Sequence, residues 1–372
     1  MSFVYTVSGI VAIMMVFPLL FGITTVLERK GLGRLQNRLG PNRVGPFGFA
    51  QFVADGIKML TKEDIVPRTA DQVVHFVAPF VLLVPVFLSF SVIPFGRKLV
   101  LADFDAGLLF FFAVGAATEL AVFMAGWSSR NKYSLLGAMR AIAQMISYEV
   151  PLVISSLTVV MLVGSLSLMD IVREQQPVRF GFLHTWHVFT PWGLAGFMLF
   201  LVAAAAESNR TPFDIPEAES EIIAGYLTEY SGFKYALFFL GEYLGLFSMC
   251  GLAITLFLGG WLAPFSFLDF VPGPIWFALK LLAMIAVFIW ARGTLPRLRT
   301  DQLLSLAWKF MLPMALINLL VAALWHYSGA WDLPAGYAVR WLLCAAPVLI
   351  SFLLLARHFS RKFTPRTYRY AD

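Results

Sequence analysis

Acidic side chains gather in the stretch ESNRTPFDIPEAESE, residues 207–221, although charged residues make up only 13% of this 372-residue chain. A short helix beginning at Pro216 would place Glu217 and Glu221 on one face and Glu219 on another. Carboxyl groups this close repel one another, so we expect some of them to hold a proton more readily than a free Glu does. A carboxyl group poised between its two protonation states can pass protons. The acids of this stretch are Glu207, Asp214, Glu217, Glu219 and Glu221.

Three more acids, Glu119, Glu149 and Glu242, lie inside strongly apolar segments. An ionisable group at the bilayer centre costs about 2.5–3.5 kcal/mol, a cost that persists only where the group has a partner, a water-filled cavity or a role. Each acid lies about eight residues, or roughly 12 Å, from the inside end of its segment. We therefore predict that these three acids, Glu207 and the acidic stretch form one proton or ion path. In the alternative interpretation, each acid pairs with a structural cation such as Lys280 or makes a polar contact between helices.

Apolar segments must position these acids. Hydrophobic residues make up 59% of the chain, which excludes a water-soluble domain and is typical of a multi-pass membrane protein. We predict an all-α polytopic protein that forms a single membrane domain over residues 1–372, with nine transmembrane helices. The predicted spans are 7–27, 73–95, 106–127, 142–164, 190–207, 235–262, 274–291, 303–325 and 338–357.

The basic residues predict the orientation of these spans. If the N-terminus lies outside, the inside segments carry 22 of the 28 Lys and Arg residues, as the positive-inside rule requires. This asymmetry explains the positive charge of the chain without a nucleic-acid partner. The N-terminus has no basic region before its apolar stretch, so we expect a first transmembrane helix rather than a cleaved signal peptide. The inside segments are 28–72, 128–141, the acidic loop 208–234, 292–309 and the tail from 357.

The first inside segment contains an apolar stripe at helical spacing, while Asp55 lies off that stripe. This pattern predicts an amphipathic helix that lies in the membrane interface. A simple surface anchor is the alternative. The residues of the stripe are Phe49, Phe52, Val53, Ile57 and Leu60.

Motifs for metal ions and redox cofactors do not occur in the sequence. The two cysteines, Cys250 and Cys344, are isolated in apolar segments, and no C-x-x-C or G-x-G-x-x-G motif is found. We therefore expect no metal site and no cofactor of the chain's own. No residue is assigned as a chemical catalyst, and any redox cofactor is expected in another chain.

Three long motifs resemble those of the NADH-ubiquinone oxidoreductase chain 1 family, a membrane component of the proton-pumping NADH:quinone oxidoreductase, respiratory complex I. They are LERKGLGRLQNRLGPNRVGPFGFAQFVADGIKMLTKED at 27–64, ESNRTPFDIPEAESEIIAGYLTEYSGFKYALFFLGEY at 207–243, and WARGTLPRLRTDQLLSLAWKFMLP at 290–313. The predicted span 338–357 carries none of this signature. It therefore looks like an addition to an eight-helix core.

The resemblance implies that the chain closes the membrane end of a quinone cavity in a complex with peripheral-arm and neighbouring membrane subunits. Quinone is then a substrate shared with those partners, in a bacterial plasma membrane or a mitochondrial inner membrane. By similarity, Glu28, Arg29 and Asp55 line the quinone passage, and Arg292 is a further candidate. Phe49, Phe52 and Ile57 could supply an apolar entrance. The same resemblance makes Glu119, Glu149, Glu207, Glu217, Glu219, Glu221 and Glu242 the acids that couple the cavity to the proton path.

Two other functions remain open at the level of the sequence. A membrane subunit of a related hydrogenase or formate-linked complex would share the acid positions without using quinone. A stand-alone cation or proton transporter would be expected to show inverted repeats and broken helix pairs. No convincing internal repeat is found in the sequence.

Overall fold

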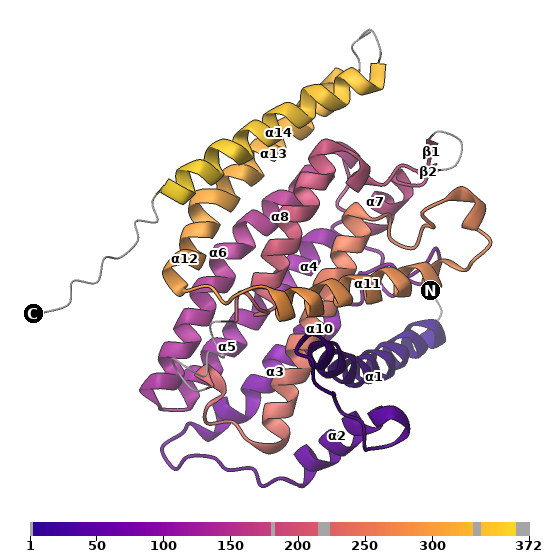
Figure 1. The fold of residues 1–372 in the computed structure, drawn as a ribbon. Coiled ribbons are helices and arrows are strands. Elements are labelled where there is room, and N and C mark those ends of the chain that lie inside the picture. Colours follow the sequence, from indigo (N-terminus) through magenta and orange to yellow (C-terminus); the bar gives the residue numbers. More distant parts are fainter. Residues whose placement is uncertain (1–2, 180–182, 215–223, 330–335, 362–372) are drawn as a thin grey trace, which may run out of the picture.

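The structure is a computed structural model, and it describes residues 3–179, 183–214, 224–329 and 336–361. It is a helical bundle with one short hairpin, β1 (Val178–Arg179) paired antiparallel to β2 (Leu183–His184) (Figure 1). Eight helices in the described part are long and apolar enough to cross a membrane. They are α1 (Phe3–Leu35), α3 (Gln72–Ser89), α4 with α5 (Gly107–Gly115, Ala117–Ser128), α6 (Lys132–Val163), α10 (Gly232–Phe257), α11 (Gly273–Thr294), α12 to α13 (Thr300–Leu306, Leu312–Ser328, joined by a π-helical turn at Ala307–Met311) and α14 (Gly336–Arg361).

The prediction of an all-α polytopic membrane protein is confirmed. The ninth predicted span, 190–207, forms α8 (Pro191–Glu207), which has 17 residues. A helix of that length rises about 26 Å, a little less than the roughly 30 Å of hydrocarbon in a bilayer. The count of nine spans and the outside position of the N-terminus therefore stay predictions.

Local signals in the sequence set several helix ends. The side chain of Asn131 accepts a hydrogen bond from the Tyr133 backbone N–H and caps α6. Thr190 caps α8 in the same way, with Pro191 in the first turn, where its missing N–H costs nothing. At its other end α6 ends at Gly164, which has a φ of 75°. These caps fix where α6 and α8 begin, and so where their acids lie.

The predicted spans identify the helices but not their full lengths. The helix α1 continues to Leu35 rather than ending at residue 27, so Glu28 and Arg29 lie within it. The helix α6 begins at Lys132 rather than at residue 142, and Glu149 is therefore 17 residues from its start. The predicted depth of about eight residues was counted from the inside end of the apolar segment, and the helix continues beyond that end, because hydropathy marks only its apolar part. The depth of Glu149 in the membrane stays a prediction.

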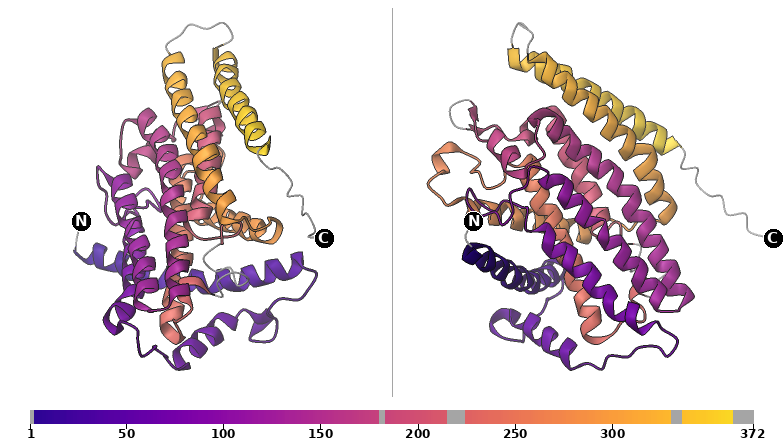
Figure 2. Two further views of the ribbon diagram at one scale, coloured as in Figure 1. Left: turned by 90° about the vertical axis from the view of Figure 1, so that its left-hand side faces the viewer. Right: turned by 180° about the vertical axis from the view of Figure 1, so that it is seen from behind.

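The helix α10 lies at the centre and is the most buried of the candidate spans. It contacts α1, α3, α8 and α11. The helix α1 crosses the bundle at a steep angle instead of running alongside it (Figure 2). Its 33 residues would extend about 50 Å, which fits a hydrocarbon layer of about 30 Å only if the helix is strongly tilted. This crossing brings the middle of α1 against both α10 and α11.

Two further helices matter for the sites below. The helix α2 (Gln51–Thr61) lies against α1 and α10 and buries none of its residues fully. The helix α7 (Leu168–Glu174) begins with Ser167 as its cap and packs against α6 and α10. At the C-terminal end of the described chain, α14 packs mainly on α13 and α8 (Figure 1).

Candidate functional site

A buried cluster of charges surrounds Glu28 in the middle of the bundle. The hydroxyl of Tyr243 on α10 donates a hydrogen bond to Glu28 Oε2 at 2.6 Å. Arg292 on α11 forms an ion pair with Glu28, and Nη1 of Arg210 lies 3.8 Å from Glu28 Oε1. Glu28 is only 6% exposed. One carboxylate thus has two guanidinium groups as neighbours, and the cluster joins α1, α10, α11 and the segment that follows α8.

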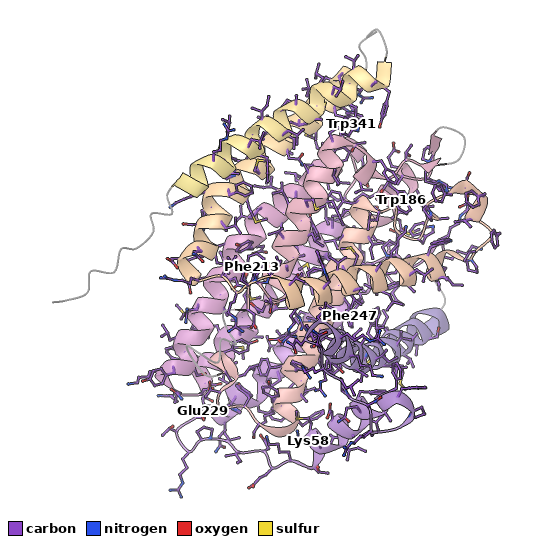
Figure 3. All side chains as sticks on the ribbon, viewed as in Figure 1. Lys58, Trp186, Phe213, Glu229, Phe247 and Trp341 are labelled. Carbon is purple, nitrogen blue, oxygen red and sulfur yellow. The ribbon has the colours of Figure 1, made fainter. Side chains whose placement is uncertain are left out.

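Arg210 stays charged although it is buried. Burial by itself lowers the pKa of a guanidinium, but Tyr243 and the Glu28 carboxylate raise the pKa of Arg210 above its ordinary value. The guanidinium carbon lies 3.7 Å from the centroid of the Tyr243 ring. The small cavity beside these residues is lined by Phe247, labelled in Figure 3 where α10 passes α1, and by Phe288 and Ile289 of α11. The polar side chains of Glu28, Arg210 and Tyr243 therefore line the same small cavity as these apolar side chains.

The segment after α8 is held in place by one buried amide. Nε2 of Gln144 on α6 donates to the carbonyl oxygens of Ala206 at 2.7 Å and Phe213 at 2.8 Å, and lies 3.2 Å from Asn209 Oδ1. The backbone N–H of Leu298 donates to the Pro212 carbonyl at 3.1 Å. These bonds fix the path of the chain between Glu207 and Asp214, which directs Arg210 towards Glu28.

Asp214 forms a second, less buried ion pair. Nη2 of Arg297, which follows α11, donates to Asp214 Oδ2 at 2.9 Å. Burial raises the pKa of the Asp214 carboxyl, and Arg297 partly offsets that shift. Arg210 is the only Lys or Arg within residues 207–221 and could have paired with Asp214. The structure instead directs Arg210 to Glu28 and brings Arg297 to Asp214 from a distant part of the chain.

Three predicted acids lie close to one another. Glu119 on α5, Glu149 on α6 and Glu207 at the end of α8 are near enough to interact electrostatically, and α6 packs against both α5 and α8. Within the described residues, Glu119 Oε1 and Glu207 Oε2 are buried without a hydrogen-bond partner. Such groups are costly in a membrane, so their grouping on three helices is the most unusual polar feature of the interior.

Glu242 lines an internal cavity that also reaches Glu207. It accepts a hydrogen bond from the Tyr226 hydroxyl at 2.7 Å. Glu207, Glu242, Asn209 and Tyr226 all contribute to the lining of this cavity, with Thr118 from α5. The cavity thus places Glu242 and Glu207 on one internal surface, which is the geometry that a connected series of carboxyl groups requires.

Lys280 is not the partner of these acids. Its Nζ donates to the carbonyl oxygens of Leu258, Gly260 and Leu262 at 2.6–2.8 Å. It also lies 4.0 Å from the centroid of the Trp186 ring. The alternative that Lys280 neutralises a buried Glu was therefore wrong, because the contacts of Nζ are with three backbone oxygens beyond the end of α10.

The residues predicted for the quinone passage lie on both sides of α1. Arg29 Nη1 lies 2.7 Å from Asp55 Oδ2, and Asp55 also accepts from Gln51 Nε2 at 3.0 Å. Phe52 was predicted to belong to the apolar stripe, but its ring packs against α1 at Gly22. A Cβ atom added at Gly22 would lie 2.6 Å from the Phe52 ring. Phe49 lies under the Lys30 ammonium at 4.4 Å. The remaining stripe of α2, Val53, Ile57 and Leu60, is exposed and faces away from the chain.

The three acids Glu217, Glu219 and Glu221 lie outside the described residues. Sequence reasoning missed Tyr243, Gln144, Arg297 and Tyr226 as members of the polar clusters. Tyr243 directly follows Glu242 in the sequence, but a helix sends adjacent side chains about 100° apart. For Gln144 and Arg297 the sequence carries no signal, since their partners are set by packing.

Comparisons with known proteins show which family the chain resembles. A family model described as NADH dehydrogenase matches residues 8–323. An NADH-quinone oxidoreductase subunit of Bacillus cytotoxicus is 50% identical over 316 residues, which cover 84% of this chain and 92% of that protein. The NADH-quinone oxidoreductase subunits of the same name from Geobacillus kaustophilus and Bacillus mycoides are each 49% identical, over 85% and 84% of this chain and 92% of each relative. The helix α14 lies wholly beyond the residues that the family model matches.

Proposed function

The chain belongs to the NADH dehydrogenase family, as a membrane component of an NADH-quinone oxidoreductase, and on that premise we propose how it works in the complex. We propose that it forms the membrane end of the quinone cavity and couples quinone reduction to proton translocation. Its partners are the other subunits of the complex. The bacterial relatives favour the bacterial plasma membrane over a mitochondrial one.

The quinone would enter between α1 and α2. A long isoprenoid tail needs an apolar passage, and the exposed face of α2 with Phe49 supports one at this position. The head group needs a few polar groups to orient it. Glu28, Arg292 and Arg29 with Asp55 lie close by on and around α1. We propose that these groups hold the head group together with residues of the partner subunits.

The coupling would run through Arg210. This residue is three positions after Glu207 in the sequence, and it reaches Glu28 on the other side of the segment. Reduction of a quinone takes two electrons and two protons, and it changes the charge of a closed cavity. In a low-dielectric interior such a change acts over many ångströms. A change of charge near Glu28 would weaken or strengthen the attraction between Glu28 and Arg210. Through the segment that Gln144 holds, this would alter the proton occupancy of Glu207.

From Glu207 the proton path would continue through the grouped acids. Glu119 and Glu149 lie near Glu207, and Glu242 shares its cavity. Together with the acids of 217–221 these groups would form a series from the inside surface to the interior. The single observation that supports this proposal best is that Arg210 connects the Glu28 cluster to the segment carrying Glu207.

The two alternatives from the sequence gain no specific support. The relatives named above are subunits of the NADH-quinone enzyme rather than of a hydrogenase or formate-linked complex. A chain that acts within such a complex is also not a stand-alone transporter.

The experiment compares Glu207→Gln with Asp301→Asn in the assembled complex, reconstituted in vesicles. Asp301 is an exposed acid paired with Arg299 at 3.3 Å, so its replacement controls for the loss of a carboxylate. We expect Glu207→Gln to slow NADH:quinone reduction and proton uptake by at least about tenfold, which corresponds to about 1.4 kcal/mol. NADH oxidation by a soluble acceptor should stay unchanged in both variants. Wild-type rates of coupled quinone reduction in assembled Glu207→Gln would refute the proposal.

A further inference from the structure

An apolar groove runs between α8, α13 and α14, away from the acids described above. From α8 it is lined by Leu194, Ala195 and Met198, and from α14 by Ala345, Leu349 and Phe352. Phe310 and Met314 form its floor. These three helices contact one another (Figure 1), so the groove is a defined channel with walls rather than a flat apolar face.

The length of the groove matches one leaflet of a bilayer. Its lining runs from Pro191 to Val202 on α8 and from Trp341 to Phe352 on α14. Eleven residues of helix rise about 16 Å, close to half of the roughly 30 Å hydrocarbon thickness. The rings of Phe310 and Phe352 are in contact at the deep end, with 5.7 Å between their centroids. A transmembrane helix of a partner would need a groove through both leaflets, whereas an acyl chain ends within one.

A second, more polar chamber adjoins the shallow end of the groove, where Trp341 contributes to the lining of both. Aromatic side chains gather around this chamber, as they do at the level of lipid headgroups. Figure 3 shows Trp186 and Trp341 at one end of the bundle, with Lys58 and Glu229 at the other. The aromatic residues of the chamber are Trp186, Phe189, Trp192, Trp325, Tyr337 and Trp341.

The chamber lining has one acid, Glu174, and several basic and hydroxyl groups that suit an anionic phosphate ester. Nε of Arg340 donates to Trp325 O and Ser328 Oγ at 3.1 Å each, which anchors the cation in the chamber wall. His326, which is exposed, and Thr190 also line the chamber. His187 also lines the chamber; it is only 9% exposed, and its Nε2 has no partner among the described residues. An arginine with neighbouring hydroxyl and imidazole groups is a typical partner for a phosphate.

We infer that this groove and chamber form a binding site for one phospholipid. One acyl chain lies in the groove between α8, α13 and α14, and the phosphate lies in the chamber near Arg340 and His326. The site depends on α14, which lies beyond the residues that the family model matches. The added helix therefore has a function of its own: it turns an exposed face of α8 and α13 into a lipid site that covers them.

The test uses the intact complex with p-benzoylphenylalanine as a photo-crosslinker, introduced by Met198→p-benzoylphenylalanine in the groove. Leu342→p-benzoylphenylalanine is the matched control, because Leu342 is 65% exposed and is not part of the groove lining. The complex comes from vesicles of phosphatidylethanolamine and phosphatidylglycerol, and bulk lipid is then exchanged for detergent before irradiation. We expect a phospholipid adduct at position 198 with at least about ten times the yield at position 342.

A second variant tests whether the groove holds the lipid. Ala195→Trp fills the groove and should abolish the adduct at position 198, whereas Leu342→Trp should leave it unchanged. Equal adduct yields at positions 198 and 342, or an adduct that survives Ala195→Trp, would overturn the inference. A quinone adduct in place of a phospholipid would overturn it too. The rate of quinone reduction in the Ala195→Trp complex should stay at the wild-type value, because the groove lies away from the residues of the function proposed above.

Discussion

Glu28 and Arg29 are neighbours on α1, yet their side chains belong to two different sites. Glu28 points into the bundle, where Tyr243, Arg292 and Arg210 surround it. Arg29 points to α2, where it pairs with Asp55 at 2.7 Å and is half exposed. Adjacent helical positions differ by about 100°, and the crossing of α1 over the bundle turns this difference into one buried and one superficial charge.

This relationship predicts very different effects for two adjacent substitutions. Glu28→Gln leaves two guanidinium groups without their carboxylate, and breaking a buried ion pair costs about 3–5 kcal/mol. Arg29→Gln removes an exposed pair that contributes about 0.2–1 kcal/mol. Thermal unfolding of the purified complex and its yield from membranes measure both effects. Similar losses in the two variants would contradict the buried role of Glu28.

The bond between Tyr226 and Glu242 predicts a second pair of effects. Glu242→Gln removes a titratable group from the cavity that Glu207 shares, so quinone reduction coupled to proton uptake should slow. Tyr226→Phe removes only the hydroxyl that donates to Glu242 at 2.7 Å, and should give a smaller loss. Glu219→Gln tests the same path at the inside loop. Steady-state rates and proton uptake in vesicles decide the order, and an assembled Glu242→Gln complex with full coupled rates would exclude this role.

The contacts of Lys280 predict that its replacement lowers the stability of the complex without lowering the rate of quinone reduction. Lys280→Met removes the donor from three backbone carbonyls at the end of α10, and each buried group left unsatisfied costs about 1–3 kcal/mol. The Tm of the complex should fall, while the quinone rate per assembled complex should not change. Lys98→Met, at an exposed position, is the control. A quinone defect at unchanged Tm would show that Lys280 acts in the proton path instead.

His187 predicts a dependence of stability on pH. Burial lowers its pKa to about 4, from an unfolded value of about 6.5. The folded state therefore favours the neutral imidazole, and the stability that this contributes is present above about pH 6.5 and is lost as pH falls towards 4. The Tm of the complex measured from pH 7 to pH 4 should drop more steeply in the wild type than in His187→Gln.

The sequence alone predicts which segments form long apolar helices and which acids lie within them. Apolar content is local, and a run of about 20 apolar residues identifies a span whatever surrounds it. It also singled out Glu119, Glu149, Glu207 and Glu242, because a carboxyl group in hydrocarbon is conspicuous in any context. The full lengths of α1 and α6 were not predicted, because hydropathy does not distinguish the polar end of a helix from a loop.

The packing of the helices sets which charges meet. Arg292 pairs with Glu28 across 264 positions of sequence, and Tyr243 reaches the same carboxylate across 215. Arg210 pairs with Glu28, while Lys280 donates to backbone oxygens instead of pairing with an acid. A charge in a low-dielectric interior takes the partner that helix packing brings within a few ångströms. That choice depends on how α1 crosses α10 and α11, and no local pattern in the sequence contains it.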